Sequence, residues 1–242
     1  MCVGPTLLID GGDISIGTAF SRQYGAVSVG FAMSLAGYSA MALGNHDLEY
    51  AAELPKKYFP VLSVNVDGYN RSVVVDVDGI RVGLLAYTNT EYFDIEKVLQ
   101  AVRREALRLR GFTDSIEEYL RQENRSGGSE KVDSEKVGSQ RSGSSTVGDR
   151  YVRSSGVTAL ADVVILIGHG GIMADRYMAR HTRGLITAVF GGHSHDLVSC
   201  EGLWHSGDAI VHAGTAGMNL GLMTLALDRS HRSDTNSVLA QY

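Results

Sequence analysis

Four short polar motifs, each following an apolar run, carry the residues whose chemistry is most informative. The motifs are GGD at 11–13, GNHD at 44–47, GHGG at 168–171 and GGHSH at 191–195. Each one places Asp, Asn or His on a glycine-rich turn directly after an expected buried strand. Carboxylate, amide and imidazole side chains gathered at the ends of neighbouring strands are typical of metal sites in α/β folds. Together, the motifs predict a metal-dependent site.

The ligand types suggest how such a site would be divided. Asp13 is the natural bridging ligand, because a carboxylate has two oxygens to share between ions, and Asn45 offers a neutral oxygen. His169 and His193 would complete the shell of one ion. His195 lies two residues beyond His193 and is expected to serve a neighbouring ion. Two ions about 4 Å apart activate a shared hydroxide and hold phosphoryl oxygens during an in-line displacement.

Two further residues of the GNHD motif suggest acid catalysis. His46 is better suited to protonate a leaving alkoxide than to bind metal, because an imidazole titrates near neutral pH. Asp47 is expected to hold the second ring nitrogen of His46. Asp10 is expected to support its turn rather than bind metal, and His212 is noted because it follows an apolar run. The remaining histidines, which lack such a context, are His181, His205 and His231.

Hydrophobic periodicity predicts the elements that position these motifs. Apolar runs typical of buried strands occupy 6–10, 39–44, 60–67, 72–77, 80–87, 161–168, 185–192, 209–214 and 220–227. Asp78-Gly79 predicts a hairpin turn between two of them. Apolar residues at helical spacing predict a helix from about Thr18 to Leu35, ended by Gly37, and a second helical stretch over 92–123, broken at Gly111. The apolar side chains of the first helix are Phe20, Tyr24, Val27, Phe31 and Leu35. This alternation predicts a layered α/β domain.

The composition changes abruptly at residues 124–156, which are rich in Ser, Gly and charge and contain no Phe, Leu, Ile or Trp. Such a segment buries too little apolar surface to offset its ordering entropy. We therefore expect a single domain over 1–228, interrupted by a disordered insertion at 124–156 and followed by a polar tail at 229–242. A regulated or partner-binding role for the insertion is the alternative.

Bulk properties exclude several classes of protein. The 242 residues carry a formal net charge of −5, which offers no electrostatic footprint for nucleic acid. No apolar stretch is long enough for a membrane span, and the first residues lack the pattern of a signal peptide. Two cysteines, Cys2 and Cys200, are too few for a disulfide scaffold. These features favour a cytoplasmic location by default, with an extracellular location as the alternative if the N-terminus is truncated.

The motifs, in this order, resemble those of the calcineurin-like metallophosphoesterases, and more narrowly the N-terminal catalytic domain of the 5′-nucleotidase family. The resemblance rests on LLIDGGDISIGTAF, GYSAMALGNHDLEY, FPVLSVNV, DGIRVGLLAYT, DVVILIGHGGIMAD, VFGGHSHD and VHAGTAGMNLGLMTL. It implies a single metallophosphoesterase domain of mixed β-sheets flanked by helices. It also implies divalent metal cofactors, two in the family, such as Mn, Zn, Fe or Co. Carried over residue by residue, it assigns Asp13, Asn45, His169, His193 and His195 to metal and His46 with Asp47 to acid catalysis.

Two departures from the family pattern affect these expectations. The family opens with a strand ending in an Asp-x-His motif, which has no counterpart here, and its C-terminal nucleotide-binding domain is absent. One ion would keep Asp13, Asn45, His169 and His193, whereas the other would keep only Asp13 and His195. We therefore expect one well-held ion, and we expect the natural chain to begin further upstream.

The resemblance implies a metallophosphoesterase that hydrolyses phosphate monoesters through a metal-activated water, with His46 as general acid. The favoured substrate is a small phosphorylated molecule, a nucleotide by resemblance. Two alternatives remain open. One is a phosphodiesterase acting on cyclic or sugar-linked nucleotides, and the other is a non-catalytic relative that binds metal or a phosphorylated ligand.

Overall fold

A computed structural model describes residues 4–52, 54–112, 159–198, 209–227 and 238–241 of the chain. The expected insertion at 124–156 lies outside the described residues, as do Cys2, Cys200, His205 and His231. None of the helices within the described part is long and apolar enough to cross a membrane.

A six-stranded sheet forms the centre of the molecule, with strand order β4-β5-β6-β7-β9-β8. Strands β5, β6, β7 and β9 run parallel, whereas β4 and β8 pair antiparallel at the two edges. Their bounds are β4 Ser72–Val77, β5 Ile80–Thr88, β6 Val163–His169, β7 Ala188–Gly191, β8 Leu197–Val198 and β9 Ile210–Ala213. This mixed sheet confirms the predicted α/β class.

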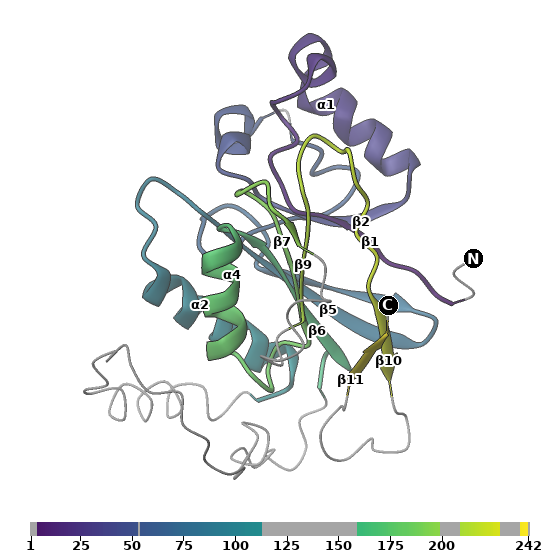
Figure 1. The fold of residues 1–242 in the computed structure, drawn as a ribbon, viewed down its shortest axis with the longest axis vertical. Coiled ribbons are helices and arrows are strands. Elements are labelled where there is room, and N and C mark those ends of the chain that lie inside the picture. Colours follow the sequence, from purple (N-terminus) through teal and green to yellow (C-terminus); the bar gives the residue numbers. More distant parts are fainter. Residues whose placement is uncertain (1–3, 53, 113–158, 199–208, 228–237, 242) are drawn as a thin grey trace.

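Different elements cover the two faces of this sheet. Helices α2 (Ile95–Leu109) and α4 (Ile172–His181) lie on one face, where they enclose the larger apolar core (Figure 1). The other face packs against a smaller parallel sheet of β1 (Leu8–Asp10), β2 (Tyr38–Ala42) and β3 (Val61–Leu62). Because successive strand residues point to opposite faces, neighbouring side chains of β5 and β6 enter different cores.

Several predicted elements form where the sequence placed them. Asp78 and Gly79 join β4 to β5 with positive φ angles of 55° and 76°, as a type I′ hairpin turn requires. Helix α2 begins after Asp94, whose side chain accepts hydrogen bonds from the amides of Glu96 and Lys97. It ends just before Gly111, which has a φ of 81°. A short 3₁₀ helix, His46–Tyr50, begins within the GNHD motif.

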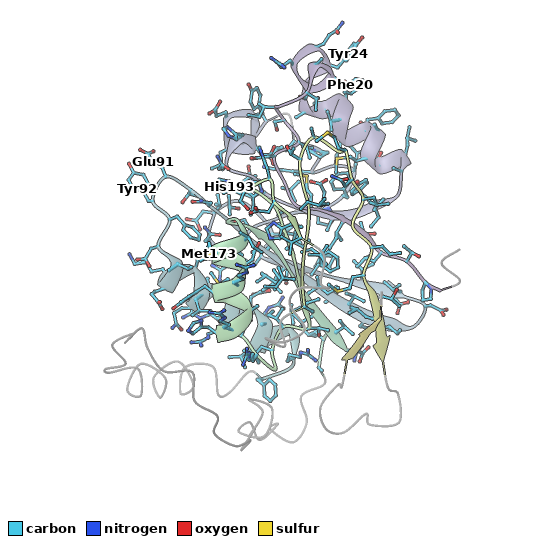
Figure 2. All side chains as sticks on the ribbon, in the orientation of Figure 1. Phe20, Tyr24, Glu91, Tyr92, Met173 and His193 are labelled. Atoms are coloured by element: carbon cyan, nitrogen blue, oxygen red, sulfur yellow. The ribbon has the colours of Figure 1, made fainter. Side chains whose placement is uncertain are left out.

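Helix α1 (Ala19–Leu35) lies at one end of the molecule, capped by Thr18 and kinked at Gly25. The apolar side chains whose spacing predicts this helix are exposed, and Phe20 and Tyr24 project outward from it (Figure 2). The buried positions of α1 are instead small residues and Met33. The helix therefore packs against β2 through this small set of buried residues. The spacing of the apolar residues predicts the helix correctly, but it does not predict which face of the helix is buried.

Two short strands lie at the C-terminal end of the described residues. Strand β10 covers only Thr224–Leu227 of the predicted run 220–227. Within the predicted tail 229–242, the structure describes 238–241, which form strand β11 (Val238–Gln241) antiparallel to β10. Residues 238–240 are Val-Leu-Ala, which is compatible with a β-strand. The average composition of 229–242 is polar and therefore does not reveal this short apolar run.

Candidate metal centre

The four polar motifs meet at one edge of the fold, where the carboxyl ends of strands from both sheets converge. GGD follows β1 and GNHD follows β2, whereas His169 is the last residue of β6 and GGHSH begins at the last residue of β7. His193 lies at this edge, above the parallel strands (Figure 2). Parallel strands aligned in this way deliver residues distant in sequence to a common site.

Four of the predicted ligand residues bring their side chains into direct contact. Asp13 Oδ2 lies 3.1 Å from His169 Nε2. Asn45 Oδ1 lies 3.1 Å from His169 Nε2 and 3.0 Å from His193 Nδ1. The ligand atoms of Asp13, His169 and His193 all lie within 4.8 Å of one another. These residues are the set that the sequence assigns to a single ion.

This arrangement fits a divalent transition metal. Ligand atoms bound at about 2.1 Å to one octahedral ion lie about 3.0 Å apart, which matches the contacts among these four residues. Two imidazoles, one carboxylate and one amide oxygen are also a donor set that such ions accept. In addition, His169 is buried, and its Nδ1 lies 2.6 Å from the carbonyl oxygen of Gly11, which fixes the ring orientation.

The electrostatics of the cluster favour charged partners in the absence of metal. Burial opposes ionisation of Asp13, but the hydrogen bond and charge of His169 outweigh it and lower the pKa of this carboxyl. Burial likewise opposes protonation of His169, yet Asp13 raises the pKa of His169 above its usual value. For His193, burial and the charge of His169 lower the pKa, so this ring presents a neutral imidazole to a metal.

Backbone conformation supports the same region as a specialised site. Among described non-glycine residues, positive φ angles occur at Asp13 (65°), His193 (77°) and His195 (59°), as well as at Asp78 and Ala216. Such conformations are sparsely populated and often occur at functional sites. Close approach also requires glycine at position 44, because a Cβ there would lie 2.0 Å from Asp13 Oδ1.

Asp47 differs from its expected role. Its buried carboxylate accepts hydrogen bonds from the amides of Asp13 (2.9 Å), Gly44 (2.9 Å) and Ser15 (3.1 Å) and from the Ser15 hydroxyl (2.6 Å). None of the hydrogen bonds among described residues joins it to the His46 ring. Asp47 therefore ties the GGD turn to the GNHD turn, and backbone amides rather than an imidazole satisfy its charge.

His46 and His195 border the cluster without joining it. His46 is exposed, and its backbone amide donates to Asp13 Oδ1 at 2.9 Å, which leaves its ring free of that contact. His195 is also exposed and lies outside the three-residue metal-binding group. Both line the same open groove of about 1200 Å³ that reaches Asp13, His169 and His193. The groove then continues along apolar residues of β6, β7 and β9.

Asn89 is a site residue that the sequence reasoning missed. It follows β5, and its Nδ2 lies 3.1 Å from His193 Nε2, on the opposite side of the ring from Asn45. If a metal binds Nδ1, then Nε2 carries the proton, and the Asn89 amide accepts it through its oxygen after a simple flip. Its only sequence signal is its position at the end of a strand that pairs with β6.

We expect Asn89→Leu to weaken Co²⁺ binding by about 10-fold or more, because residues that orient a metal-binding imidazole contribute on this scale. Asn89→Asp should keep or increase the affinity, since a carboxylate also accepts the Nε2 proton. Competition with a chelating dye measures both effects. Asn70→Ala, which alters an exposed asparagine away from the site, is the matched control. Unchanged affinity in Asn89→Leu would contradict the contact.

Asp10 supports the turn, as expected, because its Oδ1 accepts a hydrogen bond from the amide of Gly12 at 2.8 Å. Burial, with smaller contributions from the charges of Asp47 and Asp13, raises the pKa of the Asp10 carboxyl from 3.8 to about 6. The unfolded chain therefore releases this proton at lower pH than the folded chain. Stability consequently falls as pH rises from 3.8 to about 6, and the full cost persists above that range.

We expect Asp10→Asn to stabilise the metal-free protein by about 1–3 kcal/mol near neutral pH, because the amide keeps the acceptor without the buried charge. Near the lower end of the titration range, the same change should have little effect. Chemical denaturation in the presence of a chelator measures the free energy of unfolding at both pH values. Asp76→Asn, on the exposed β4–β5 hairpin, is the control. Equal effects at both pH values would refute the assignment.

Comparisons with known proteins identify relatives and structural neighbours of this chain. No family model matches the chain. It is 28% identical over 209 residues to a 5′-nucleotidase of Diplobatis ommata, covering 79% of this chain and 30% of that protein. The fold is similar to a putative 5′-nucleotidase from Staphylococcus aureus, with a TM-score of 0.55 and 15% identity, covering 97% of this chain and 44% of that one. It is also similar to a sulfate thiohydrolase from Thermus thermophilus, with a TM-score of 0.54 and 19% identity, covering 91% and 35%.

The chain spans about a third of the length of the curated relatives it matches. Several curated relatives with this coverage carry the name 5′-nucleotidase, and their similarity extends across most of this chain. The structural neighbours share the layered α/β fold. On these grounds, the chain is similar to 5′-nucleotidases over most of its own length, and it shares the layered α/β fold of solved 5′-nucleotidase structures.

Proposed function

We propose that this domain hydrolyses phosphate monoesters, with nucleotides as the substrate class. One observation carries the proposal, which is the convergence of Asp13, Asn45, His169 and His193 at ligand-to-ligand distances of 3.0–3.1 Å. The names of the relatives favour a nucleotide substrate. The fold alone does not identify the substrate as a nucleotide, because a sulfate thiohydrolase has a similar fold.

Each side chain has a distinct part in the proposed reaction. Asp13, Asn45, His169 and His193 hold the divalent ion, and Asp47 fixes the two turns that carry Asp13 and Asn45. When bound, such an ion supplies Lewis-acid polarisation of the phosphoryl group and of the attacking water. As water attacks phosphorus and the ester P–O bond breaks, His46 donates a ring proton to the leaving oxygen. The exposed position of His46 in the groove suits contact with that oxygen.

Metal-dependent assays with three substrates test this proposal. The metal-free protein is titrated with Mn²⁺, Co²⁺ and Zn²⁺ and then assayed with p-nitrophenyl phosphate, a nucleoside 5′-monophosphate and bis-p-nitrophenyl phosphate. Metal-dependent release of phosphate from the two monoesters, faster than cleavage of the diester, supports the proposal. Preferred cleavage of the diester would favour a phosphodiesterase. Metal binding without turnover would indicate a non-catalytic domain.

A further inference from the structure

A row of four paired residues crosses the central sheet directly beneath the site. Tyr87 of β5 pairs with Gly168 of β6, Gly168 with Gly191 of β7, and Gly191 with His212 of β9. Two residues earlier on the same strands, the paired row is wholly apolar, comprising Leu85, Leu166, Val189 and Ile210. The chemistry of this sheet face therefore changes from apolar to polar at the last row before the site.

The carboxylate of Asp175 lies over the two glycines of this row. It comes from the first turn of α4, and its Oδ1 accepts a hydrogen bond from the Tyr87 hydroxyl at 2.6 Å. On the other side, Oδ2 lies 2.8 Å from His212 Nε2. Glycine is required beneath it, because a Cβ at Gly168 or Gly191 would lie 1.8 Å or 2.1 Å from these oxygens. One carboxylate thus spans four strands.

Tyr87, Asp175 and His212 are so deeply buried that their mutual interactions must offset the cost of removing them from water. Tyr87 and Asp175 have no exposed surface, and His212 is 2% exposed. The contact between His212 Nε2 and Asp175 Oδ2 is short, although it is not aligned as a hydrogen bond. The N-terminal end of α4 also favours a negative charge in its first turn. A row of apolar residues in these positions would stabilise the fold at least equally well, because buried polar groups are costly to desolvate.

The position of the row suggests what it does instead. His169 directly follows Gly168, and His193 follows Gly191 by two residues. The Gly192 amide donates to the Gly168 carbonyl at 2.8 Å, which links the two strand ends beyond the row. Displacing the Asp175 carboxylate would therefore release both strand ends that carry the imidazoles.

We infer that Tyr87, Asp175 and His212 form a positioning row that sets His169 and His193 at metal-binding distance. The inference rests on the proposed function, because it assigns these residues to the same metal centre. None of the three touches the metal ligand atoms in the described contacts, so they act through the backbone of Gly168 and Gly191.

The full 242-residue chain tests this role through Co²⁺ affinity, the Co²⁺ absorption spectrum and thermal unfolding. His212→Leu and Asp175→Asn should each weaken Co²⁺ binding about 10–100-fold and change the intensity of the visible bands. His212→Gln keeps a polar N–H group beside the Asp175 carboxylate and should keep affinity within about threefold of that of the unaltered chain. Thr182→Val removes a buried hydroxyl at the far end of α4 and is the matched control.

The outcomes separate positioning from a purely structural role. A lower melting temperature with unchanged Co²⁺ affinity and spectrum in His212→Leu would overturn the inference. If Asp175→Asn fails to fold, Tyr87→Phe decides, because it removes only one hydroxyl, and unchanged Co²⁺ binding there would also overturn it. If the unaltered chain binds no Co²⁺, the proposed metal centre itself fails. If the unaltered chain and every variant bind Co²⁺ with the same affinity, the proposed metal centre stands and only the positioning role of Tyr87, Asp175 and His212 is refuted.

Discussion

His46→Ala is expected to lower kcat for phosphate monoesters about 10²–10⁴-fold, the usual contribution of a general acid. The bound metal should be nearly unchanged, because the described contact of His46 with the cluster is made by its backbone amide, which alanine retains. Steady-state kinetics with a nucleoside 5′-monophosphate, whose leaving alcohol is poorly acidic, combined with metal analysis of the same samples, measures both quantities. A loss confined to kcat indicates a group that acts on the leaving oxygen.

The choice of leaving group sharpens this test. An ester whose alcohol is a strong acid needs little protonation, so His46→Ala should impair it less than an ester of a poorly acidic alcohol. His181→Ala, which alters an exposed histidine on α4, controls for general effects of removing an imidazole. If His46→Ala empties the site as fully as His193→Ala, then His46 is a ligand and the assigned role is wrong.

The sequence predicted the location of the candidate site because strand ends are readable from local patterns. Apolar runs followed by glycine and a polar residue place Asp13, Asn45, His169 and His193 at strand termini, and parallel pairing then brings such termini together. The hairpin at Asp78-Gly79 was equally legible, because two positive φ angles suit few residue types. In both cases, the signal lies within a few consecutive residues.

Contacts that depend on packing between distant segments were not readable in this way. Asp47 adjoins His46 in sequence, but its carboxylate turns to the amides of Asp13 and Ser15, more than thirty residues away. Asn89 lacks a glycine-rich turn, so nothing local distinguishes it from an ordinary loop residue. Similarly, the burial of Asp175 depends on two glycines in other strands. A pattern read along one segment contains no information about these partners.

The exposed apolar residues of α1 show that the buried face of a helix is likewise not predictable from its own sequence. Helical spacing of Phe20, Tyr24 and Phe31 identifies the helix, yet each of these side chains is about half exposed. Periodicity reports that the apolar residues share one side of a helix. It does not report which side the rest of the fold covers, and here Ser21, Ala26 and Gly30 occupy the buried seam.

Asp13→Asn should have the largest effect on metal binding, with a loss of affinity of more than about 100-fold. The substitution keeps the size of the side chain and an oxygen for the His46 amide, but it removes the only carboxylate in the described metal-binding group. A neutral amide donates weaker electron density to a divalent cation and leaves the two imidazoles and Asn45 without a charged partner. Isothermal titration with Mn²⁺ or Co²⁺ measures the loss directly.

Activity and pH dependence supply independent readouts of the same substitution. Turnover at limiting metal should fall at least about 10³-fold, because metal stabilisation of the transition state amounts to several kcal/mol. In the unaltered chain, metal affinity should also fall as pH is lowered, since Asp13 raises the pKa of His169 and protons compete for its ring nitrogen. Asp13→Asn removes that cause, so its weak residual binding should depend less on pH. Asp76→Asn on the β4–β5 hairpin controls for charge removal alone, and equal metal affinities in the two variants would exclude Asp13 as a ligand.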